Sequence, residues 1–331
     1  MYTTVIMINR NGGTFLRDAL QTCRADLEAT WQSRQDFELL VVDNGSTDDS
    51  LSVIKAEISS APFKARIIEE LSLGVNSARN AGLKEATGDF LIFVDSDIRF
   101  HSGWLAAYLG AADRYPEIEV FAGCVQIGLI EGAIPNWLDL TGPWKRSCIV
   151  VQADFGKDPA VFQITPNCGP VGPNMAFRRS IFERAGTFDI QFGLRPGSLV
   201  AGAEAEFFDR LSHFDASFAW VPDAVVDHPL KRQQINRLYF LNRLHGIGRV
   251  TARIACMRGT PAKRLFGLTL YRVPELFCAL LAWLRATLQA DSCRAFYYQG
   301  EVYVLVGYLY EDFIQWRTLR SHPNINILIY L

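Results

Sequence analysis

The sequence has seven cysteines but no CxxC pair, and the cysteines are scattered along the chain. An odd number of isolated cysteines disfavours a disulfide framework and favours a reducing cytoplasm. The first residues, MYTTVIMINRNGG, lack the basic region and long apolar stretch of a secretory signal, and we expect a strand there. No internal repeat is present. Charged residues make up 21% of the chain and hydrophobic residues 49%, so the chain lacks the high charge of a disordered protein. A globular protein with a packed core is expected.

Acidic residues are missing between residues 231 and 264, where nine Lys or Arg residues occur. Residues 1–228 carry 19 Lys/Arg and 30 Asp/Glu, a net charge of −11. Residues 229–331 carry 14 Lys/Arg and 5 Asp/Glu, a net charge of +9. A chain of 331 residues can form one large domain with an appendage. We therefore expect an acidic domain over residues 1–228, followed by a basic, helical region over residues 229–331.

Apolar runs of strand length alternate with helix-period stretches in the first part of the chain, which is typical of βαβ units. In the first expected helix, apolar residues keep the spacing of one buried face. Ser46 and Asp49 resemble a capping box at the start of the second helix. The expected strands are residues 3–8, 38–42, 65–68 and 90–94, and the expected helices are residues 14–30, 51–58 and 77–86.

The strand expected at residues 90–94 is apolar throughout, which indicates that both of its faces are covered. Short apolar strands followed by helices predict a mostly parallel, three-layer α/β/α sheet, in which ligands bind beyond the carboxyl ends of the strands. Asp43, Asp95 and Asp97 fall at those ends. Residues 127–173 are rich in Gly, Pro and Trp and predict long loops, which are usually functional.

The tripeptide Asp95-Ser96-Asp97 supplies carboxylate oxygens, the ligands that a hard divalent cation requires. Such a cation can hold a nucleotide diphosphate and stabilise it as a leaving group. Two acids at a strand end can equally form a turn or cap a helix. The tripeptide alone does not decide between these interpretations.

Longer motifs around these acids are more specific. The segment GVNSARNAGLKEATGDFLIFVDSD, residues 74–97, follows FELLVVDNGSTDDS, residues 37–50. Together with residues 172–189 and 202–211, these segments resemble family 2 glycosyltransferases over roughly the first 230 residues. The resemblance implies the GT-A fold, with a Rossmann-like sheet between layers of helices, and an enzyme that acts on nucleotide-diphosphate sugars.

Several residues match positions that have roles in that family. Asp43 resembles the acid that recognises the nucleotide base, and Arg79 lies in the segment that lines the same pocket. Asp95 resembles the acid near the ribose, and Asp97 resembles the ligand of a divalent metal, Mn²⁺ or Mg²⁺. A turn-forming acid is the alternative for Asp43, and a surface ion pair is the alternative for Arg79. Asn9, Arg10 and Asn11 resemble the loop after the first strand that closes over the nucleoside in this family.

Transfer of a sugar to a hydroxyl also requires a base, which in inverting enzymes is usually a carboxylate. The family's Gly-Glu-Asp motif reads Gly202-Ala203-Glu204 here, so the resemblance implies Glu204 as the base and removes a supporting acid at Ala203. Glu206 could partly replace that acid, but two residues apart on a helix the side chains point about 200° from each other. The alternative is that both acids only favour the helix dipole.

Three further features are ambiguous. His228 resembles a histidine near the metal or the diphosphate, with capping or packing as the alternative. Asn174 resembles an asparagine on the acceptor or donor-sugar side, with a turn role as the alternative. Trp137 and Trp144 lie in a Gly/Pro-rich segment, where they could stack on a sugar ring or anchor loops.

The basic region contains an apolar run, residues 265–284, that is about as long as a membrane span. Two charged residues and a proline interrupt it at residues 272–275, so we do not expect it to be transmembrane. Peripheral contact of residues 229–290 with an anionic membrane would explain the charge and the apolar run together. The alternative is a helical appendage that packs on the acidic body, with an oligomer interface near residues 302–309. The basic residues scatter around the expected helices, so their pattern does not distinguish membrane contact from packing on the acidic body.

The sequence thus predicts an inverting, metal-dependent glycosyltransferase, with a nucleotide-binding half over residues 1–126 and an acceptor half over residues 127–228. The expected donor is a nucleotide-diphosphate sugar, with a UDP-sugar as first choice. The expected acceptor is a saccharide or a lipid-linked molecule in the synthesis of cell-surface polysaccharide, glycan or glycolipid. We expect no nucleic-acid partner, a location in the cytoplasm or on the inner face of the membrane, and leave a homo-oligomer open.

Two other functions compete with this prediction. A sugar nucleotidyltransferase needs a Gly-rich phosphate loop followed by a lysine, and no lysine lies near residues 9–13. A degenerate relative that only binds sugar or acts as a scaffold is suggested by Ala203 alone.

Overall fold

The computed structural model describes residues 1–142, 149–165, 168–197, 202–260 and 262–321. The chain divides into two compact units. The first unit comprises residues 1–130, 151–196 and 203–230, and the second comprises residues 131–150, 197–202 and 231–331. The division after residue 230 lies close to the expected boundary at residue 228, but two short earlier segments also belong to the second unit.

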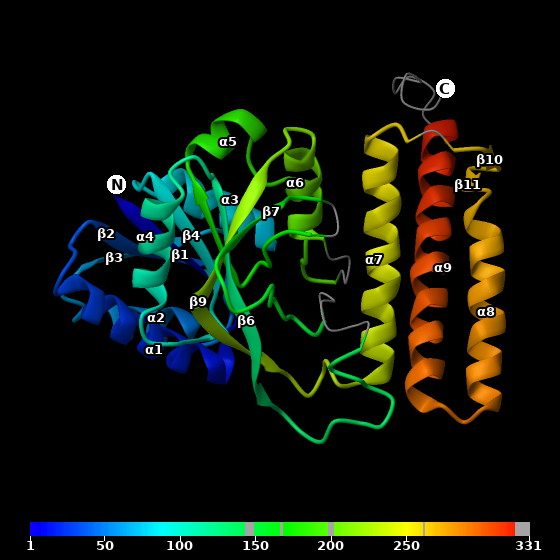
Figure 1. Cartoon of the computed structure of the whole chain (residues 1–331), viewed down its shortest axis with the longest axis horizontal. Helices are drawn as coiled ribbons and strands as arrows, with labels where there is room; N and C mark the ends of the chain where they lie inside the picture. Colours follow the sequence, from blue (N-terminus) through cyan, green and yellow to red (C-terminus); the bar gives the residue numbers. More distant parts are fainter. Residues whose placement is uncertain (143–148, 166–167, 198–201, 261, 322–331) are drawn as a thin grey trace. The chain divides into compact units, whose positions relative to one another are not determined.

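A mixed sheet forms the centre of the first unit (Figure 1). Within the described residues it has nine strands: β1 (Thr3–Asn9), β2 (Phe37–Asp43), β3 (Lys64–Glu69), β4 (Phe90–Asp95), β5 (Arg99–Phe100), β6 (Val120–Ile130), β7 (Ala160–Gln163), β8 (Asn174–Arg178) and β9 (Ser217–Leu230). Their order is β3-β2-β1-β4-β8-β6-β9-β5, with β7 paired to β9. Strands β1 to β4 run parallel to one another, whereas β8 runs antiparallel to β4. The predicted α/β class, with a largely parallel sheet, is confirmed.

Helices connect the parallel strands. The helices of the first unit are α1 (Gly13–Trp31), α2 (Ser50–Ile58), α3 (Val75–Glu85), α4 (Trp104–Arg114), α5 (Ser180–Ala185) and α6 (Ala203–Ser212). From β1 to β3 the chain moves outward along the sheet, and after α3 it returns past β1 to form β4. Because such crossovers are right-handed, α3 covers the face opposite to α1 and α2. The strand order reverses between β1 and β4, which is where sheets of this type bind ligands.

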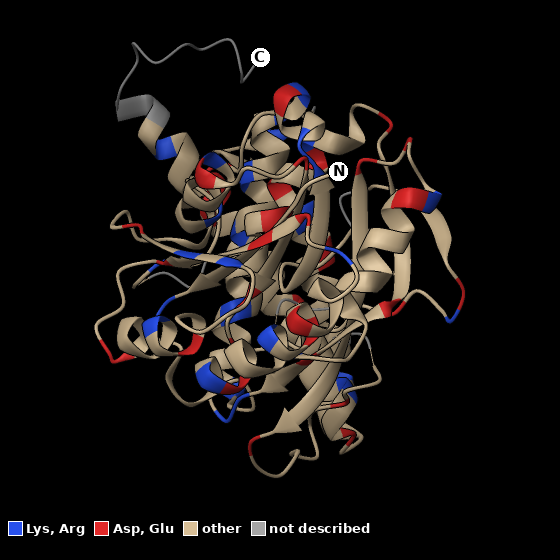
Figure 2. Ribbon diagram, turned by 90° about the vertical axis from the view of Figure 1, so that its left-hand side faces the viewer, with Lys and Arg blue, Asp and Glu red and all other residues tan. Residues whose placement is uncertain are grey.

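The core of the first unit is apolar on both faces of β1, β2 and β4, as expected for central strands. Charged residues lie mostly on the helices and loops (Figure 2). Glu38 in β2 is a buried exception. Burial alone would raise the pKa of Glu38, but hydrogen bonds from Arg66, Lys64 and Thr87 lower it to about 2. The carboxylate is therefore ionised inside the sheet and compensated by cations at its edge.

The predicted capping box at the start of α2 is wrong. Helix α2 begins at Ser50 after Asp49, and the Asp49 side chain makes no capping hydrogen bond. The Ser46 hydroxyl instead donates to the Asp43 carboxylate at 2.6 Å. Ser46 therefore belongs to the turn that follows β2.

In the described part of the second unit there are three long helices, α7 (Arg237–Met257), α8 (Arg272–Leu288) and α9 (Ser292–Ser321), and a hairpin of β10 (Arg264–Leu265) and β11 (Leu268–Thr269). Helix α9 lies between α7 and α8 (Figure 1). At the α7–α9 crossing, a Cβ atom on Gly248 would lie 1.9 Å from the carbonyl oxygen of Val304. A Cβ atom on Gly307 would lie 2.1 Å from the carbonyl oxygen of His245. The two backbones are therefore in contact, and both positions require glycine.

Residues 302–309, considered as an oligomer interface, lie within α9. Val302, Leu305 and Tyr308 of this stretch are buried, so much of it packs inside the chain. Among the described residues, no helix has both the length and the apolar character needed to cross a membrane.

The two candidate sugar-stacking tryptophans lie in the segment that joins the second unit. The Trp137 ring packs on Phe240 and Phe296, with centroid distances of 6.2 and 4.2 Å. Trp137 is therefore a loop anchor. Trp144 lies outside the described residues.

Candidate functional site

Asn9 connects the carboxyl ends of β2 and β4. Its Nδ2 donates to Oδ1 of Asp43 at 2.9 Å, and its Oδ1 accepts a hydrogen bond from the Ser96 hydroxyl at 2.9 Å. In the sheet, Asn9 is paired with Asp43, and Ile8 is paired with Asp95. Asp43 and the Asp95-Ser96-Asp97 tripeptide therefore lie along the same edge of the sheet, as the sequence predicted.

The loops after β1 and β2 are held together around Asp43, which is buried. Its Oδ2 accepts from the backbone N–H of Ser46 at 3.1 Å, which is the turn role considered as the alternative. The Ser46 hydroxyl accepts from the backbone N–H of Asn11, and the Asn11 side chain accepts from the backbone N–H of Thr47. Arg10 is exposed at the tip of the same loop. Asp43 thus fixes the shape of the loop that was expected to cover the nucleoside.

Asp95, Asp97 and His228 form a cluster at this edge. Each offers one ligand atom, and these atoms lie within 4.8 Å of one another. Nε2 of His228 is 3.8 Å from Oδ1 of Asp97. His228 is buried in β9, whereas both acids are half-buried and remain accessible. Two carboxylates and one imidazole nitrogen fit a divalent cation such as Mn²⁺ or Mg²⁺. Asp95, expected near the ribose, is therefore also placed where it could ligate a cation held by Asp97 and His228.

Glu204 and Arg79 form an ion pair between α6 and α3. Nη2 of Arg79 donates to Oε1 of Glu204 at 2.6 Å, and the Arg79 and Glu204 side chains are 2% and 27% exposed. A Cβ atom on Gly172 would lie 2.2 Å from that oxygen and 2.5 Å from Nη2 of Arg79, so the pair fills the space that glycine leaves. Gly172 lies two residues before the start of β8, whose Asn174 pairs with Val94 beside the end of β4. Glu204 is thus brought toward the edge that carries the acidic tripeptide.

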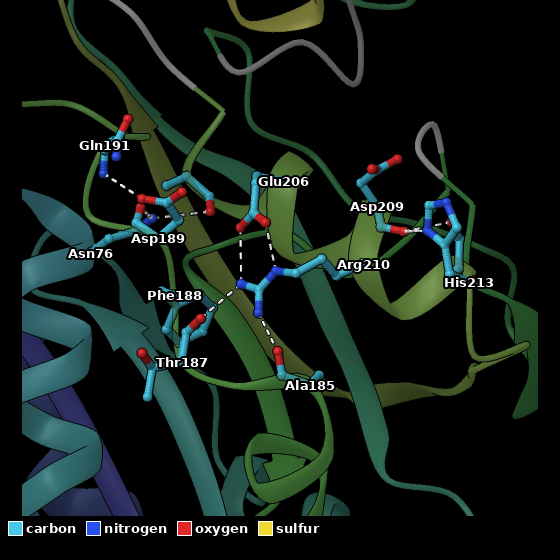
Figure 3. Close-up of polar contacts among 12 residues, drawn as sticks. Asn76, Ala185, Thr187, Phe188, Asp189, Gln191, Glu206, Asp209, Arg210 and His213 are labelled. Carbon is cyan, nitrogen blue, oxygen red and sulfur yellow. Dashed lines mark hydrogen bonds and ion pairs between the residues drawn. The ribbon is translucent and has the colours of Figure 1, made fainter. Parts of the chain in front are cut away.

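Glu206 has different partners. Nε and Nη2 of Arg210 donate to its two carboxylate oxygens at 2.5 and 2.9 Å, and Arg210 also donates to the carbonyl oxygens of Ala185 and Thr187 (Figure 3). Glu206 is buried, and Arg210, which it holds, ties α6 to the end of α5 and to the segment after it. Glu204 and Glu206 therefore have separate environments, and Glu204 is the more exposed of the two.

Two asparagines of helix α3, Asn76 and Asn80, have roles that the sequence did not predict. Nδ2 of Asn76 donates to the carbonyl oxygens of Asp189 and Ala203 at 2.8 and 3.2 Å. Asn80 exchanges two hydrogen bonds with the backbone of Phe188, at 2.7 and 3.0 Å. These contacts dock the α3 motif against the segment before α6. The spacing of four residues, which puts both amides on one helical face, was the available signal.

Asn174 is fully buried at the start of β8. Its Oδ1 accepts from Trp104 and Tyr108, and its Nδ2 donates to the carbonyl oxygens of Cys124 and Ala224, all at 2.8 to 2.9 Å. This geometry argues against the expected contact with a sugar, because the amide is saturated within the sheet. We assign Asn174 to positioning of the strands and of α4.

The fold and this edge define a class of α/β enzyme with a sheet-edge site suited to a cation and a phosphate-bearing ligand. The family model for glycosyl transferase family 2 matches residues 4–186, more than half of the chain. The chain therefore belongs to glycosyl transferase family 2. The family, the fold and the enzyme class predicted from the sequence are confirmed.

Individual relatives match with moderate similarity. An uncharacterised glycosyltransferase of Nostoc sp. is 36% identical over 97 residues, which is 29% of this chain and 28% of the relative. The undecaprenyl-phosphate 4-deoxy-4-formamido-L-arabinose transferase of Pseudomonas savastanoi pv. phaseolicola is 26% identical over 255 residues, 75% of this chain and 65% of the relative. In both cases the match spans less than two thirds of the relative's own length.

A solved structure extends the similarity to the fold. The mannosyltransferase of Pyrobaculum calidifontis, in complex with GDP-Man and Mn²⁺, superposes with a TM-score of 0.56 at 17% identity. The match covers 97% of this chain and 87% of that one. At this identity the similarity establishes the shared fold.

Proposed function

We propose that this protein transfers a sugar from a nucleotide-diphosphate sugar to an acceptor hydroxyl with inversion at the anomeric carbon. The observation that carries the proposal is the cluster of Asp95, Asp97 and His228, within 4.8 Å of one another at the edge where β4 ends. The same edge carries Asp43 and the loop after β1, so a nucleotide could extend from the loop to the cluster.

The donor would be held by two groups of residues. Asp95, Asp97 and His228 would hold Mn²⁺ or Mg²⁺, and the bound ion would supply positive charge for the departing diphosphate. Asp43 and the loop of residues 9–11 would border the nucleoside. The Pyrobaculum calidifontis mannosyltransferase, whose structure contains GDP-Man and Mn²⁺, supports this arrangement by analogy of fold.

Glu204 is the proposed base. Its Oε1 is held by Arg79, and its Oε2 has no hydrogen-bond partner among the described residues. Oε2 would take the proton of the acceptor hydroxyl while the acceptor oxygen forms a bond to the anomeric carbon. The bond from that carbon to the diphosphate oxygen breaks, and the nucleoside diphosphate leaves with the electron pair. Attack from the face opposite to the leaving group inverts the anomeric configuration.

The acceptor class follows from the relatives and is the broadest part of the proposal. We propose a saccharide or lipid-linked acceptor in the synthesis of a cell-surface polysaccharide, glycan or glycolipid. The Pseudomonas relative is named as an undecaprenyl-phosphate sugar transferase, which supports the lipid-linked option. UDP-sugars and GDP-Man are the first donors to test.

Release of nucleotide tests the proposal. The full chain is incubated with single nucleotide sugars and Mn²⁺ or Mg²⁺, and free nucleoside diphosphate is measured with and without candidate acceptors. A transferase releases it with at least one donor, slowly without acceptor and faster with one, and loses activity in EDTA. The anomeric configuration of the product, measured by NMR, must be opposite to that of the donor.

The same assay separates the two competing functions. A sugar nucleotidyltransferase would instead make pyrophosphate from a nucleoside triphosphate and a sugar phosphate. A degenerate relative would bind a nucleotide sugar and release nothing from any donor. Either outcome would overturn the proposal, and membership of glycosyl transferase family 2 favours the transferase.

A further inference from the structure

Helix α8 carries an apolar face that no described part of the second unit covers. Only Ala286 of this helix is buried, although the helix packs along α9. The exposed apolar side chains, between 41% and 79% exposed, are Val273, Phe277, Leu280, Leu281, Leu284 and Leu288. At 3.6 residues per turn, these six positions fall within a sector of about 100°. We call this sector the α8 face.

Exposed apolar side chains also occur in the β10–β11 hairpin and in the two residues that link it to α8. Leu265, Phe266, Leu270 and Tyr271 are exposed there. Phe266 has a φ of 50°, and the following Gly267 lies against the Trp316 ring, so the turn is held on α9 while Phe266 points outward. The apolar run at residues 265–284 is thus divided into a hairpin and an amphipathic helix.

Exposed cations lie on α8 itself and in the segments that flank it in the chain. Between residues 257 and 318 the exposed cations are Arg258, Lys263, Arg285, Arg294 and Arg317. Of the five acids in this range, Glu275 is exposed. Glu311 and Asp312 are buried, the first paired with Arg249 and Arg253 and the second bonded to the backbone N–H of Thr269. Asp291, whose side chain is 40% exposed, lies 3.7 Å from Arg294, and Glu301 is half-buried. Exposed cations therefore outnumber exposed acids in this part of the chain.

We propose that the α8 face lies in the surface of an anionic membrane, parallel to its plane. Leucine and phenylalanine side chains on one face of a helix insert about 5–10 Å into the boundary between headgroups and acyl chains. Arg285, which lies about 40° beyond the face on the same helix, meets anionic headgroups, and each further Lys or Arg near the membrane surface adds to the attraction. A second copy of the chain is a poorer occupant, because two such faces would bring the same cations together. The proposal does not depend on the catalytic activity.

Binding of the full chain to vesicles tests the proposal without any nucleotide sugar. Sedimentation with vesicles of phosphatidylglycerol mixed with phosphatidylcholine should carry the protein down, and vesicles of phosphatidylcholine alone should carry down much less. The double variant Phe277→Ser with Leu281→Ser should bind about a hundredfold more weakly, about tenfold for each large apolar side chain removed. Leu129→Ser, the same kind of change at an exposed leucine of β6, is the matched control and should bind as the unchanged protein does.

A charge variant separates the two contributions. Lys263→Glu with Arg285→Glu should weaken binding to the anionic vesicles and reduce its sensitivity to salt. Thermal unfolding of every variant should match that of the unchanged protein, since all substituted side chains are exposed. Nucleotide release in solution should also be unchanged, so that loss of membrane binding is distinguished from loss of catalysis.

Three outcomes would overturn the proposal. The first is equal binding by the Phe277/Leu281 variant and the unchanged protein. The second is equal binding to the phosphatidylglycerol-containing vesicles and to vesicles of phosphatidylcholine alone. The third is a dimer in sedimentation velocity that the Phe277/Leu281 substitutions dissociate, in a protein that does not bind vesicles, which would make a second copy of the chain the occupant.

Discussion

The buried guanidinium of Arg79 donates to the carboxylate of Glu204, a residue 125 positions later in the chain. This contact holds Oε1 and leaves Oε2 as the oxygen that we propose takes the acceptor proton. Glu204→Gln keeps the shape and a hydrogen-bond acceptor for Arg79 but removes the basic oxygen. The rate of transfer should fall by about 10² to 10⁴, the usual contribution of a general base, while donor affinity stays the same. Initial rates and calorimetric titration with the nucleoside diphosphate measure the two effects.

Glu206→Gln is the matched control for that experiment. Since Glu206 is paired with Arg210, this change should lower the midpoint of thermal unfolding and leave most of the transfer rate. Normal turnover by Glu204→Gln, together with inactivity of a folded Glu206→Gln, would reassign the base to Glu206.

Gly172 provides a second test of the same pair. In Gly172→Ala the new Cβ atom would overlap Oε1 of Glu204 and Nη2 of Arg79, so the ion pair must shift. A misplaced base should lower the transfer rate by about tenfold or more. Gly110→Ala in α4 is the control, because no atom lies within 4 Å of its new Cβ. Equal rates for the two variants would mean that the position of the pair does not affect catalysis.

Asp97→Asn tests the cation site. The substitution keeps the size of the side chain and removes a charged ligand from the cluster with Asp95 and His228. Affinity for a nucleoside diphosphate in the presence of Mn²⁺ should fall by about a hundredfold or more, close to the value measured in EDTA. Asp113→Asn, on the surface of α4, should leave the affinity unchanged. Full Mn²⁺-dependent binding by Asp97→Asn would remove Asp97 from the site.

The stability of the first unit should depend on pH through Glu38. The pKa of Glu38 in the folded protein is about 2, below the ordinary value of 4.5. Its stabilising contribution is therefore fully present above pH 4.5 and is lost as the pH falls toward 2. Glu38→Gln should lower the free energy of unfolding at pH 7 by about 2 kcal/mol, and the difference should shrink at pH 3. Urea unfolding at both pH values measures it, with the exposed Glu117→Gln as control.

The sheet and its acidic edge could be predicted because their signals are local. Alternation of apolar runs with helical periods marked β1 to β4, and the strand ends then located Asp43 and Asp97. The partners of Glu204 could not be predicted, since Arg79 and Gly172 come from distant segments and no local pattern connects them. Tertiary packing, not sequence spacing, decided these contacts.

The roles of Asn174 and of the α8 face were harder to predict from the sequence, for different reasons. A polar residue at a strand start is equally compatible with a ligand and with a saturated amide, and only the positions of Trp104 and Tyr108 separate the two. The apolar run at residues 265–284 hid the helical stripe because its first part forms a hairpin, where the helical period does not apply. The stripe becomes visible only from Val273 onward.

Asn9 joins Asp43 to Ser96 through one amide group, which donates on one side and accepts on the other. Ser96 lies between Asp95 and Asp97, the two acids proposed to hold the cation. If cation binding moves the end of β4, the Asn9 side chain transmits that movement from Ser96 to Asp43. Metal and nucleoside affinities should consequently be cooperative, each ligand strengthening the other by the same factor.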